Sequence, residues 1–586
     1  MIMRFPPRPR SIGVVVLSGA VALATLANGC VLRRPTAAPA GSPTLRGMAR
    51  RVGGDVVERL LRGYHPERSA DVAIVAEPSN VVVRWSGTSL DAGIPDPRTT
   101  HATPWSYHQR VPIVLYGPGY VTKGIRSNAV ADVADLAPTL AELMRFPFRA
   151  VDGEVLSGAL LPAGRRKGRP RVIVVVAFDG GGWNLFQRYP AAWPMVRRLA
   201  REGATYLNAT IGSSPSVTAA IHATMGTGAY PRTHGIPEHA IRRPDGSVGD
   251  VFRGQEADPS LLAVETVADA WDRENGNRPW TGLVATEAWH LGMLGKGALA
   301  SGGDRDVAVF WDRDGLRFHT NQEAYSLPSE LPGRAVLDRH LQDLDATDGA
   351  RDGAWMGNDL ASPRVILGSP AFVRYQGGAV LDILRREQIG RDDLTDLLFV
   401  EFKSTDLGAH IWNLVGPEEP HVLRAQDEVV EEMVRLLDRL VGRDRYVIAL
   451  TADHGLTPLP ETVGGIRIHP DVVGERVDEY FGRDLVERVT PAGLYLDRQA
   501  LADAGITVTE VARFVSGLRY RDVLPPDADP GDIPSDVADD RVFAAVLPAA
   551  FLQALTEDAA RSFGPGAFPE GNLTSPQHPY ADVLRG

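Results

Sequence analysis

The feature that most constrains the fold is a run of seven apolar residues, from Val172 to Phe178, which ends at Asp179 and three glycines. Consecutive rather than alternating apolar residues are typical of a strand buried on both faces, as in parallel sheets that helices cover on both sides. Four further segments share this β-branched character and are predicted strands: Val72–Ala76, Pro112–Tyr116, Leu397–Phe402 and Tyr446–Thr451.

Segments with apolar residues at helical spacing follow several of these strands. The predicted helices are Val133–Met144, Pro194–Glu202, Val217–Met225 and Val422–Val441. The alternation predicts an α/β fold with a mostly parallel central sheet, helices on both faces and inserted cap regions. Ligands of such sheets bind at the carboxyl ends of the strands, so polar residues that directly follow a strand are candidate site residues.

The first residues predict export. Residues 1–29 combine early arginines with an apolar run, Ile12 to Ala27, that is short for a membrane span. Cys30 is the only cysteine, so no internal disulfide can form, and residues 30–50 are a predicted flexible tether. We expect an exported protein at the cell surface or in the periplasm. Two outcomes are open at Cys30: acylation, which would tether the chain to a membrane as a lipoprotein, or cleavage and release.

The charge of the chain limits the classes of partner. The formal net charge is −11, which argues against a general nucleic-acid binder because affinity for the phosphate backbone needs clustered Lys and Arg. A small anionic substrate would therefore need a local cation at its site.

Asp179 is the first candidate site residue, because it stands at the end of a strand before glycines that let the backbone turn tightly. A turn residue is the alternative interpretation. Thr218 is the second, at the start of a predicted helix whose free backbone N–H groups suit a phosphate. The alternative there is that Thr218 or Ser216 only caps the helix.

Two carboxylate–imidazole sets follow strands later in the chain. Asp406 and His410 lie four residues apart, which places both on one side of a helical turn, as a divalent metal requires, although an ion pair is the alternative. Asp453 and His454 are adjacent at the end of another strand. Three acidic positions at strand ends, two of them with histidines, favour a metal site over three unrelated turns.

Together these motifs resemble the alkaline phosphatase superfamily, in particular its nucleotide pyrophosphatase/phosphodiesterase branch, between about residues 170 and 460. The resemblance rests on Asp179, on Thr218 with T-x-x-x-H and TG-x-YP-x-x-HGI, on the D-x-x-x-H of Asp406 and His410, and on the ADHG of Asp453 and His454.

The resemblance implies an alkaline phosphatase-like fold with two zinc ions, although another divalent metal stays open. Asp179, Asp453 and His454 would hold one ion beside Thr218. Asp406, His410 and one more histidine would hold the other. Thr218 would then be the metal-bound nucleophile that forms a phospho-threonine intermediate.

The missing histidine points to a changed chain order. In the family it follows all the other motifs, whereas here the similar stretch, RTTHATPWSYHQRVPIVLYGPGYVTKG, lies near the N-terminus. We therefore predict a circular permutation in which residues 51–150 are the usual C-terminal segment and His101 is the third ligand. The alternative is that His469 completes the site. Where the family has His-Gly, this chain has His101-Ala102, a minor change provided that the backbone does not need a glycine conformation.

This order predicts one catalytic domain over residues 51–586. The segment 164–170 is a predicted basic, glycine-rich linker, and residues 171–586 are the core, with insertions near 239–376 and 458–548.

Two departures from the family bear on the substrate. His239 stands where the family has an asparagine that donates to a phosphoryl oxygen. Glu287, Trp289 and His290 stand where phosphomonoesterases have Lys-x-Arg, and Trp289 would stack on a base or other ester group, with a core tryptophan as the alternative.

We expect a phosphodiesterase or nucleotide pyrophosphatase that acts on a small phosphate ester, with nucleotides among the candidate substrates. A phosphomonoesterase is the second reading, and a non-catalytic surface-binding lipoprotein is the third. A sulfatase is disfavoured, because those relatives need a modifiable residue in a C/S-x-P-x-R setting.

Overall fold

The computed structural model describes residues 44–83, 98–313, 315–524, 533 and 535–555. The predicted signal segment and Cys30 lie outside these residues. The predicted tether 30–50 is described only from residue 44, and helix α1 (Leu45–Val52) begins inside it. Within the described ranges, no helix combines the length and apolar character needed to span a membrane.

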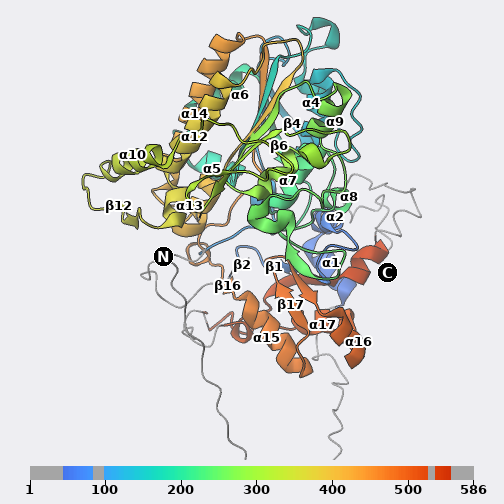
Figure 1. Cartoon of the computed structure of the whole chain (residues 1–586). Helices are drawn as coiled ribbons and strands as arrows, with labels where there is room; N and C mark the ends of the chain where they lie inside the picture. The colour runs from blue at the N-terminus through green and yellow to red at the C-terminus, as the bar shows by residue number, and fades with distance from the viewer. Residues whose placement is uncertain (1–43, 84–97, 314, 525–532, 534, 556–586) are drawn as a thin grey trace, which may run out of the picture.

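A nine-stranded mixed sheet forms the centre of the larger part of the molecule (Figure 1). Five of its eight neighbouring strand pairs are parallel, and only β3 and β11 run opposite to the other strands. The predicted α/β class is therefore confirmed. In spatial order the strands are β11 (Arg317–His319), β10 (Val307–Asp312), β9 (Thr281–Val284), β14 (Asp396–Phe402), β5 (Val172–Phe178), β15 (Tyr446–Thr451), β3 (Ile113–Tyr116), β6 (Ala204–Thr210) and β4 (Ile125–Asp132).

The continuous apolar run of β5 follows from its place in the middle of this sheet. Its odd-numbered residues face one hydrophobic core and its even-numbered residues face the other, so neither side meets water. The first core is completed by α4 (Leu136–Met144), α7 (Thr218–Thr227) and α9 (Val267–Glu274). The second is completed by α5 (Trp183–Arg188), α6 (Pro194–Glu202), α10 (Arg334–Asp345), α11 (Pro363–Gly368), α12 (Pro370–Arg386), α13 (Ser404–Trp412) and α14 (Glu419–Leu440).

The predicted strands and helices all occur, with bounds that differ by at most a few residues. One expectation about their roles is wrong: region 239–376 is not only an insertion, because it supplies β9, β10 and β11 to the central sheet. The same region also contains the hairpins β7–β8 (Ala240–Arg242, Val248–Asp250) and β12–β13 (Ala354–Trp355, Asn358–Asp359).

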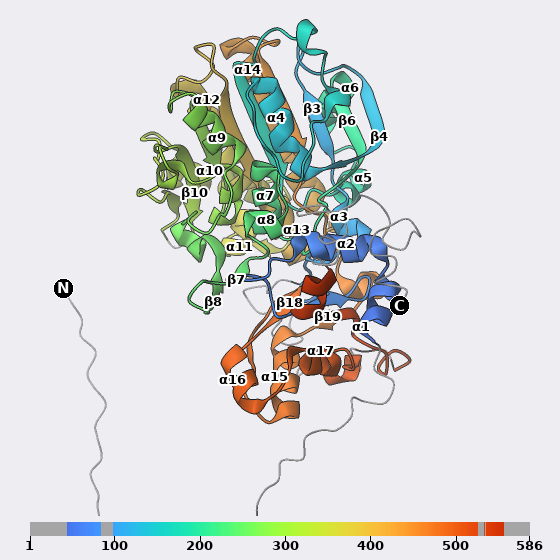
Figure 2. The ribbon, with the colours of Figure 1, turned by 90° about the vertical axis from the view of Figure 1, so that its right-hand side faces the viewer.

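A second, smaller unit is built from segments near both ends of the described chain (Figure 2). Its antiparallel sheet has the order β17 (Val486–Val489), β18 (Gly493–Leu496), β1 (Val72–Ala76) and β19 (Phe543–Pro548). The predicted strand β1 therefore exists but pairs here rather than in the central sheet. Its helices are α1, α2 (Gly54–Gly63), α15 (Pro470–Phe481), α16 (Arg498–Ala504) and α17 (Val508–Val515), and β2 (Val81–Val82) pairs with β16 (Arg467–Ile468).

Asp71 links this smaller unit to Arg242 in the hairpin β7–β8 of the larger part. Its carboxylate accepts hydrogen bonds from Arg242 Nη2 at 2.8 Å, from the backbone N–H of Leu496 at 2.9 Å and from Arg498 Nε at 2.8 Å. Both Asp71 and Arg242 are buried. The two units are therefore held together by a buried ion pair as well as by apolar contacts.

Asp71→Ala should lower the free energy of unfolding by about 3 kcal/mol, because it leaves the buried Arg242 with only part of its charge compensated. Urea denaturation would measure this. The matched control is Glu428→Ala, which breaks a half-exposed pair with Arg374 and should cost less than about 1 kcal/mol. Equal losses in the two variants would contradict the role given to Asp71.

Candidate functional site

Three neighbouring parallel strands bring the predicted acidic residues together. β14, β5 and β15 lie side by side, and their carboxyl ends meet at one edge of the sheet. Asp179 follows β5, Asp453 follows β15, and Asp406 lies in the first turn of α13, just after β14. The adjacent strand ends thus explain how residues more than two hundred positions apart come to share one site.

The first predicted ligand set is buried and close. His454 Nε2 lies 3.1 Å from Asp453 Oδ2 and 3.6 Å from Asp179 Oδ1, and all three side chains are 0% exposed. The backbone N–H of Gly180 donates to Asp453 Oδ1 at 3.1 Å. This bond leaves Asp453 Oδ2 to face the imidazole.

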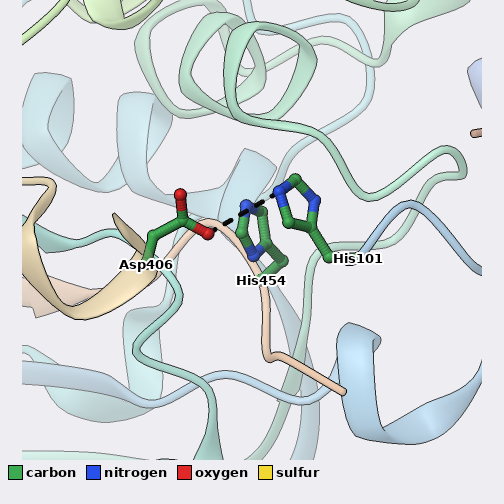
Figure 3. Close-up of side chains that lie close together, drawn as sticks. All are labelled: His101, Asp406 and His454. Carbon is green, nitrogen blue, oxygen red and sulfur yellow. Dashed lines mark ion pairs between the residues drawn. The ribbon is translucent and has the colours of Figure 1, made fainter. Parts of the chain in front are cut away.

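The second predicted set lies beside it, and Figure 3 shows two of its members, His101 and Asp406, next to His454 of the first set. His101 Nε2 is 3.6 Å and His410 Nε2 is 3.2 Å from Asp406 Oδ1. The ring of His101 stacks on that of His454 with centroids 3.6 Å apart, so the two sets touch. The structure thus places His101 with Asp406, whereas the alternative His469 directly precedes α15 in the smaller unit. Ala102 has a φ of 91°, so the loop does take a glycine-like conformation.

Thr218 begins α7 and is fully buried. The capping interpretation is wrong for both candidates: the N-cap is Val217, without a side-chain cap bond, and Ser216 Oγ instead donates to the carbonyl of Thr103 at 3.0 Å. The Thr218 hydroxyl is therefore not used as a helix cap. Because Thr218 is the first helical residue, the backbone N–H groups of this turn have no intrahelical acceptor.

Five histidines at this site share one hydrogen-bonding pattern. In each, Nδ1–H donates to a backbone carbonyl, which fixes the tautomer and leaves Nε2 without a proton when the ring is neutral. The pairs are His101 with Ser216 (2.6 Å), His222 with Thr218 (2.9 Å), His290 with Glu287 (2.7 Å), His410 with Thr99 (2.6 Å) and His454 with Gly455 (3.1 Å).

The pKa shifts agree with this pattern for three of these histidines and depart from it for His454. Burial lowers the pKa of His222 to about 4 and those of His101 and His290 well below their usual value, so these rings are neutral near pH 7. Burial also disfavours charge on His454, but the adjacent Asp453 outweighs it and raises its pKa to about 9. Burial and the neighbouring Asp453 raise the pKa of Asp179 to about 7.

This arrangement fits bound cations. Asp179 Oδ1, Asp406 Oδ1 and Asp453 Oδ2 are all buried without a hydrogen-bond partner in the described structure, and each faces an imidazole Nε2. Where the ring is neutral, as at His101, which faces Asp406 Oδ1 at 3.6 Å, two acceptors meet with no proton between them, which is unfavourable at low dielectric. Carboxylate oxygen and imidazole nitrogen are both zinc ligands, so the residues present suit that ion.

Three further acceptors lie in the same centre, and the sequence did not predict them as part of the metal site. His222 and His290 form a candidate metal-ligand group with Asp179, and His290 Nε2 lies 3.0 Å from Asp179 Oδ2 and 3.3 Å from Glu401 Oε1. His222 is visible in the T-x-x-x-H motif as the residue one helical turn after Thr218. Glu401 lies within the apolar strand β14 and gave no comparable signal.

Lys403 is the other residue that sequence reasoning missed. Its ammonium lies 2.8 Å from Asp179 Oδ2, 2.8 Å from Asp406 Oδ2 and 3.1 Å from Thr218 Oγ1. Burial disfavours its charge, but Asp179 and Asp406 outweigh this and raise its pKa, so the side chain is protonated.

The predicted substrate residues lie next to each other. The rings of His239 and Trp289 stack with centroids 4.1 Å apart, and both side chains are partly exposed. Glu287 forms an ion pair with Arg313. Where the family has Lys-x-Arg, this chain therefore has the carboxylate of Glu287, which is paired with Arg313, and the aromatic ring of Trp289.

Two glycines set how closely the strand ends approach. A Cβ atom added to Gly182, after Asp179, would lie 2.5 Å from Gly455 Cα, after His454. The loops that carry two of the metal-facing carboxylates thus touch backbone to backbone.

Comparisons with known proteins show which proteins this chain is similar to. The family model described as type I phosphodiesterase / nucleotide pyrophosphatase matches residues 173–533. Alkaline phosphatase PafA of Elizabethkingia meningoseptica is 22% identical over 408 residues, which are 59% of this chain and 72% of that protein. Alkaline phosphatase PhoV of Synechococcus elongatus is 23% identical over 337 residues, which are 50% of this chain and 60% of that protein. The crystal structure of wild-type alkaline phosphatase PafA aligns with a TM-score of 0.49 and 18% identity, covering 65% of this chain and 85% of that one.

If His101 is the predicted third ligand, His101→Ala should weaken zinc binding by more than about 100-fold, because it would remove a ligand rather than a residue that only orients one. Zinc would be removed with a chelator and titrated back against a chromophoric competitor. His469→Ala is the matched control and should bind zinc like the wild type. A larger loss in the His469 variant would show that His469, not His101, completes the site.

Proposed function

The chain belongs to the type I phosphodiesterase / nucleotide pyrophosphatase family, a branch of the alkaline phosphatase superfamily, and from this we propose that it hydrolyses phosphate diesters at a two-zinc centre through a covalent intermediate on Thr218. The family predicted from the sequence motifs is thereby confirmed, and the chain is a hydrolase at that level. One observation carries the finer proposal: buried carboxylate oxygens without partners face imidazole nitrogens, and Lys403, which contacts Asp179 and Asp406, also donates to the buried Thr218 hydroxyl at 3.1 Å.

The proposed ligands divide into two sets. Asp179, Asp453 and His454 would hold one ion, and Asp406, His410 and His101 the other. Bound zinc would supply positive charge that stabilises the phosphoryl group during transfer.

Thr218 would carry the phosphoryl group. As Oγ attacks phosphorus in line, an Oγ–P bond forms while the bond to the leaving oxygen breaks, and that oxygen departs with the electron pair and takes up the proton that the hydroxyl gives up. Water then attacks the same phosphorus, the Oγ–P bond breaks, and Thr218 Oγ takes a proton from that water. The free backbone N–H groups of the first turn of α7 are placed to donate to phosphoryl oxygens.

The preference for diesters is supported by the surroundings of Glu287. A phosphate monoester brings an extra negative charge, and the predicted substrate face offers a carboxylate already paired with Arg313 and a tryptophan ring. Nucleotides are candidate substrates because Trp289 offers a stacking surface. His239 would donate to a phosphoryl oxygen. The second candidate, phosphomonoesterase activity, is favoured by the relatives named alkaline phosphatase.

The chain order supports a circular permutation, which we also propose. Residues 113–144 supply β3, β4 and α4 to the central unit, and the preceding loop brings His101 to the metal centre. The backbone N–H of Ala102 donates to Ser216 Oγ at 3.2 Å, which joins this loop to the turn before Thr218. The His101 and His469 variants test the ligand assignment that follows from this order.

Zinc-loaded protein should hydrolyse bis(p-nitrophenyl) phosphate faster than p-nitrophenyl phosphate, and Thr218→Ala should lower kcat on both by at least about 1000-fold, because the attacking oxygen is lost. Release of p-nitrophenol measures both rates. Wild-type rates in the Thr218 variant would remove Thr218 from its role. Faster turnover of the monoester would instead favour phosphomonoesterase activity.

We further propose that the chain is exported and tethered to a membrane through a lipid on Cys30. Full-length protein should then fractionate with membranes, and Cys30→Ser should release it into the soluble fraction, as immunoblotting would report. Soluble wild-type protein of reduced length would instead indicate cleavage without acylation.

A further inference from the structure

We infer that Lys403 is a catalytic residue: a third cation of the centre, placed between two aspartates, that donates a hydrogen bond to Thr218 Oγ1, the attacking oxygen. The inference rests on the proposed function for the identity of that oxygen. It adds a charged group that the expected ligand set does not contain.

The first support is the buried position of the side chain. Lys403 is 3% exposed and lies between β14 and α13, so its ammonium cannot reach bulk water without moving the end of the strand. Its three contacts, to Asp179, Asp406 and Thr218, come from three separate elements of the chain. An ammonium has three N–H donors, and each contact can take one.

The second support is the way the two aspartates divide their oxygens. Lys403 contacts Oδ2 of Asp179 and Oδ2 of Asp406. The Oδ1 atoms of the same residues are buried without a hydrogen-bond partner and face His454 and His410. Each carboxylate thus offers one oxygen to a metal and the other to the ammonium, so Lys403 does not have to leave when both ions bind.

This division gives Lys403 a defined task. The ammonium contacts the Oδ2 atoms of both aspartates, and the same group donates to the hydroxyl of Thr218. A donor preorganised on a reacting oxygen stabilises charge that develops there without having to reorient.

The inference predicts opposite changes in metal affinity and turnover. Lys403→Met removes a positive charge next to the two ions and frees two carboxylate oxygens, so zinc affinity should rise at least about tenfold. Turnover of zinc-saturated protein on bis(p-nitrophenyl) phosphate should fall at least about 100-fold, the usual cost of losing one such donor. A residue that served only to hold the fold together would lower both quantities when removed.

The test titrates zinc into chelator-treated protein and then measures kcat at saturating zinc. Lys403→Gln, which keeps a neutral donor, is the second variant in case the methionine variant fails to fold, and it should show the same two directions. Lys123→Met, at an exposed position, is the matched control and should change neither quantity.

The outcomes separate this inference from the proposed function. Higher zinc affinity with lower kcat supports it. Lower zinc affinity, or a kcat within about threefold of the wild type, overturns it. If zinc-loaded wild-type protein hydrolyses neither ester, the proposed function fails, and zinc affinity alone then decides whether Lys403 acts as a cation of the centre.

Discussion

The centre of this protein depends on the cost of burying negative charge. Asp179, Asp406 and Asp453 are at most 1% exposed and lie among imidazoles whose Nδ1 protons are already committed to backbone carbonyls. Such a cluster is stable only if cations compensate the carboxylates. Lys403 supplies one positive charge from within the chain, and the unpartnered oxygens indicate where further charge is required.

Much of the central unit could be predicted because its signals are local. The apolar run of β5 identifies a strand buried on both faces, and the rule that ligands bind at strand ends leads directly to Asp179 and Asp453. The pairing of β1 could not be predicted in this way. Its partners, β18 and β19, lie more than four hundred residues later, and an apolar strand does not identify its neighbour. The same limit applies to β9, β10 and β11, which are short and lie in a region of irregular pattern.

The site residues that were missed share a physical cause. Lys403 precedes the D-x-x-x-H motif, where a lysine usually points to water, and only the meeting of three chain segments makes its burial possible. His290 appeared as part of an altered substrate motif, yet its ring contacts Asp179 rather than an open face. Spacing predicts which residues share a helix face, but not which side chains from distant segments turn inward together.

The backbone contact between Gly182 and Gly455 has a consequence for ion choice. A Cβ atom at Gly182 would lie 2.5 Å from Gly455 Cα, so the loops after Asp179 and Asp453 approach this closely only because Gly182 carries no side chain. An alanine at Gly182 or Gly455 would push the two loops apart and separate Asp179 from Asp453, although every proposed ligand would still be present. Gly182 and Gly455 would then help to determine whether a small or a large divalent ion fits, although neither has a side chain.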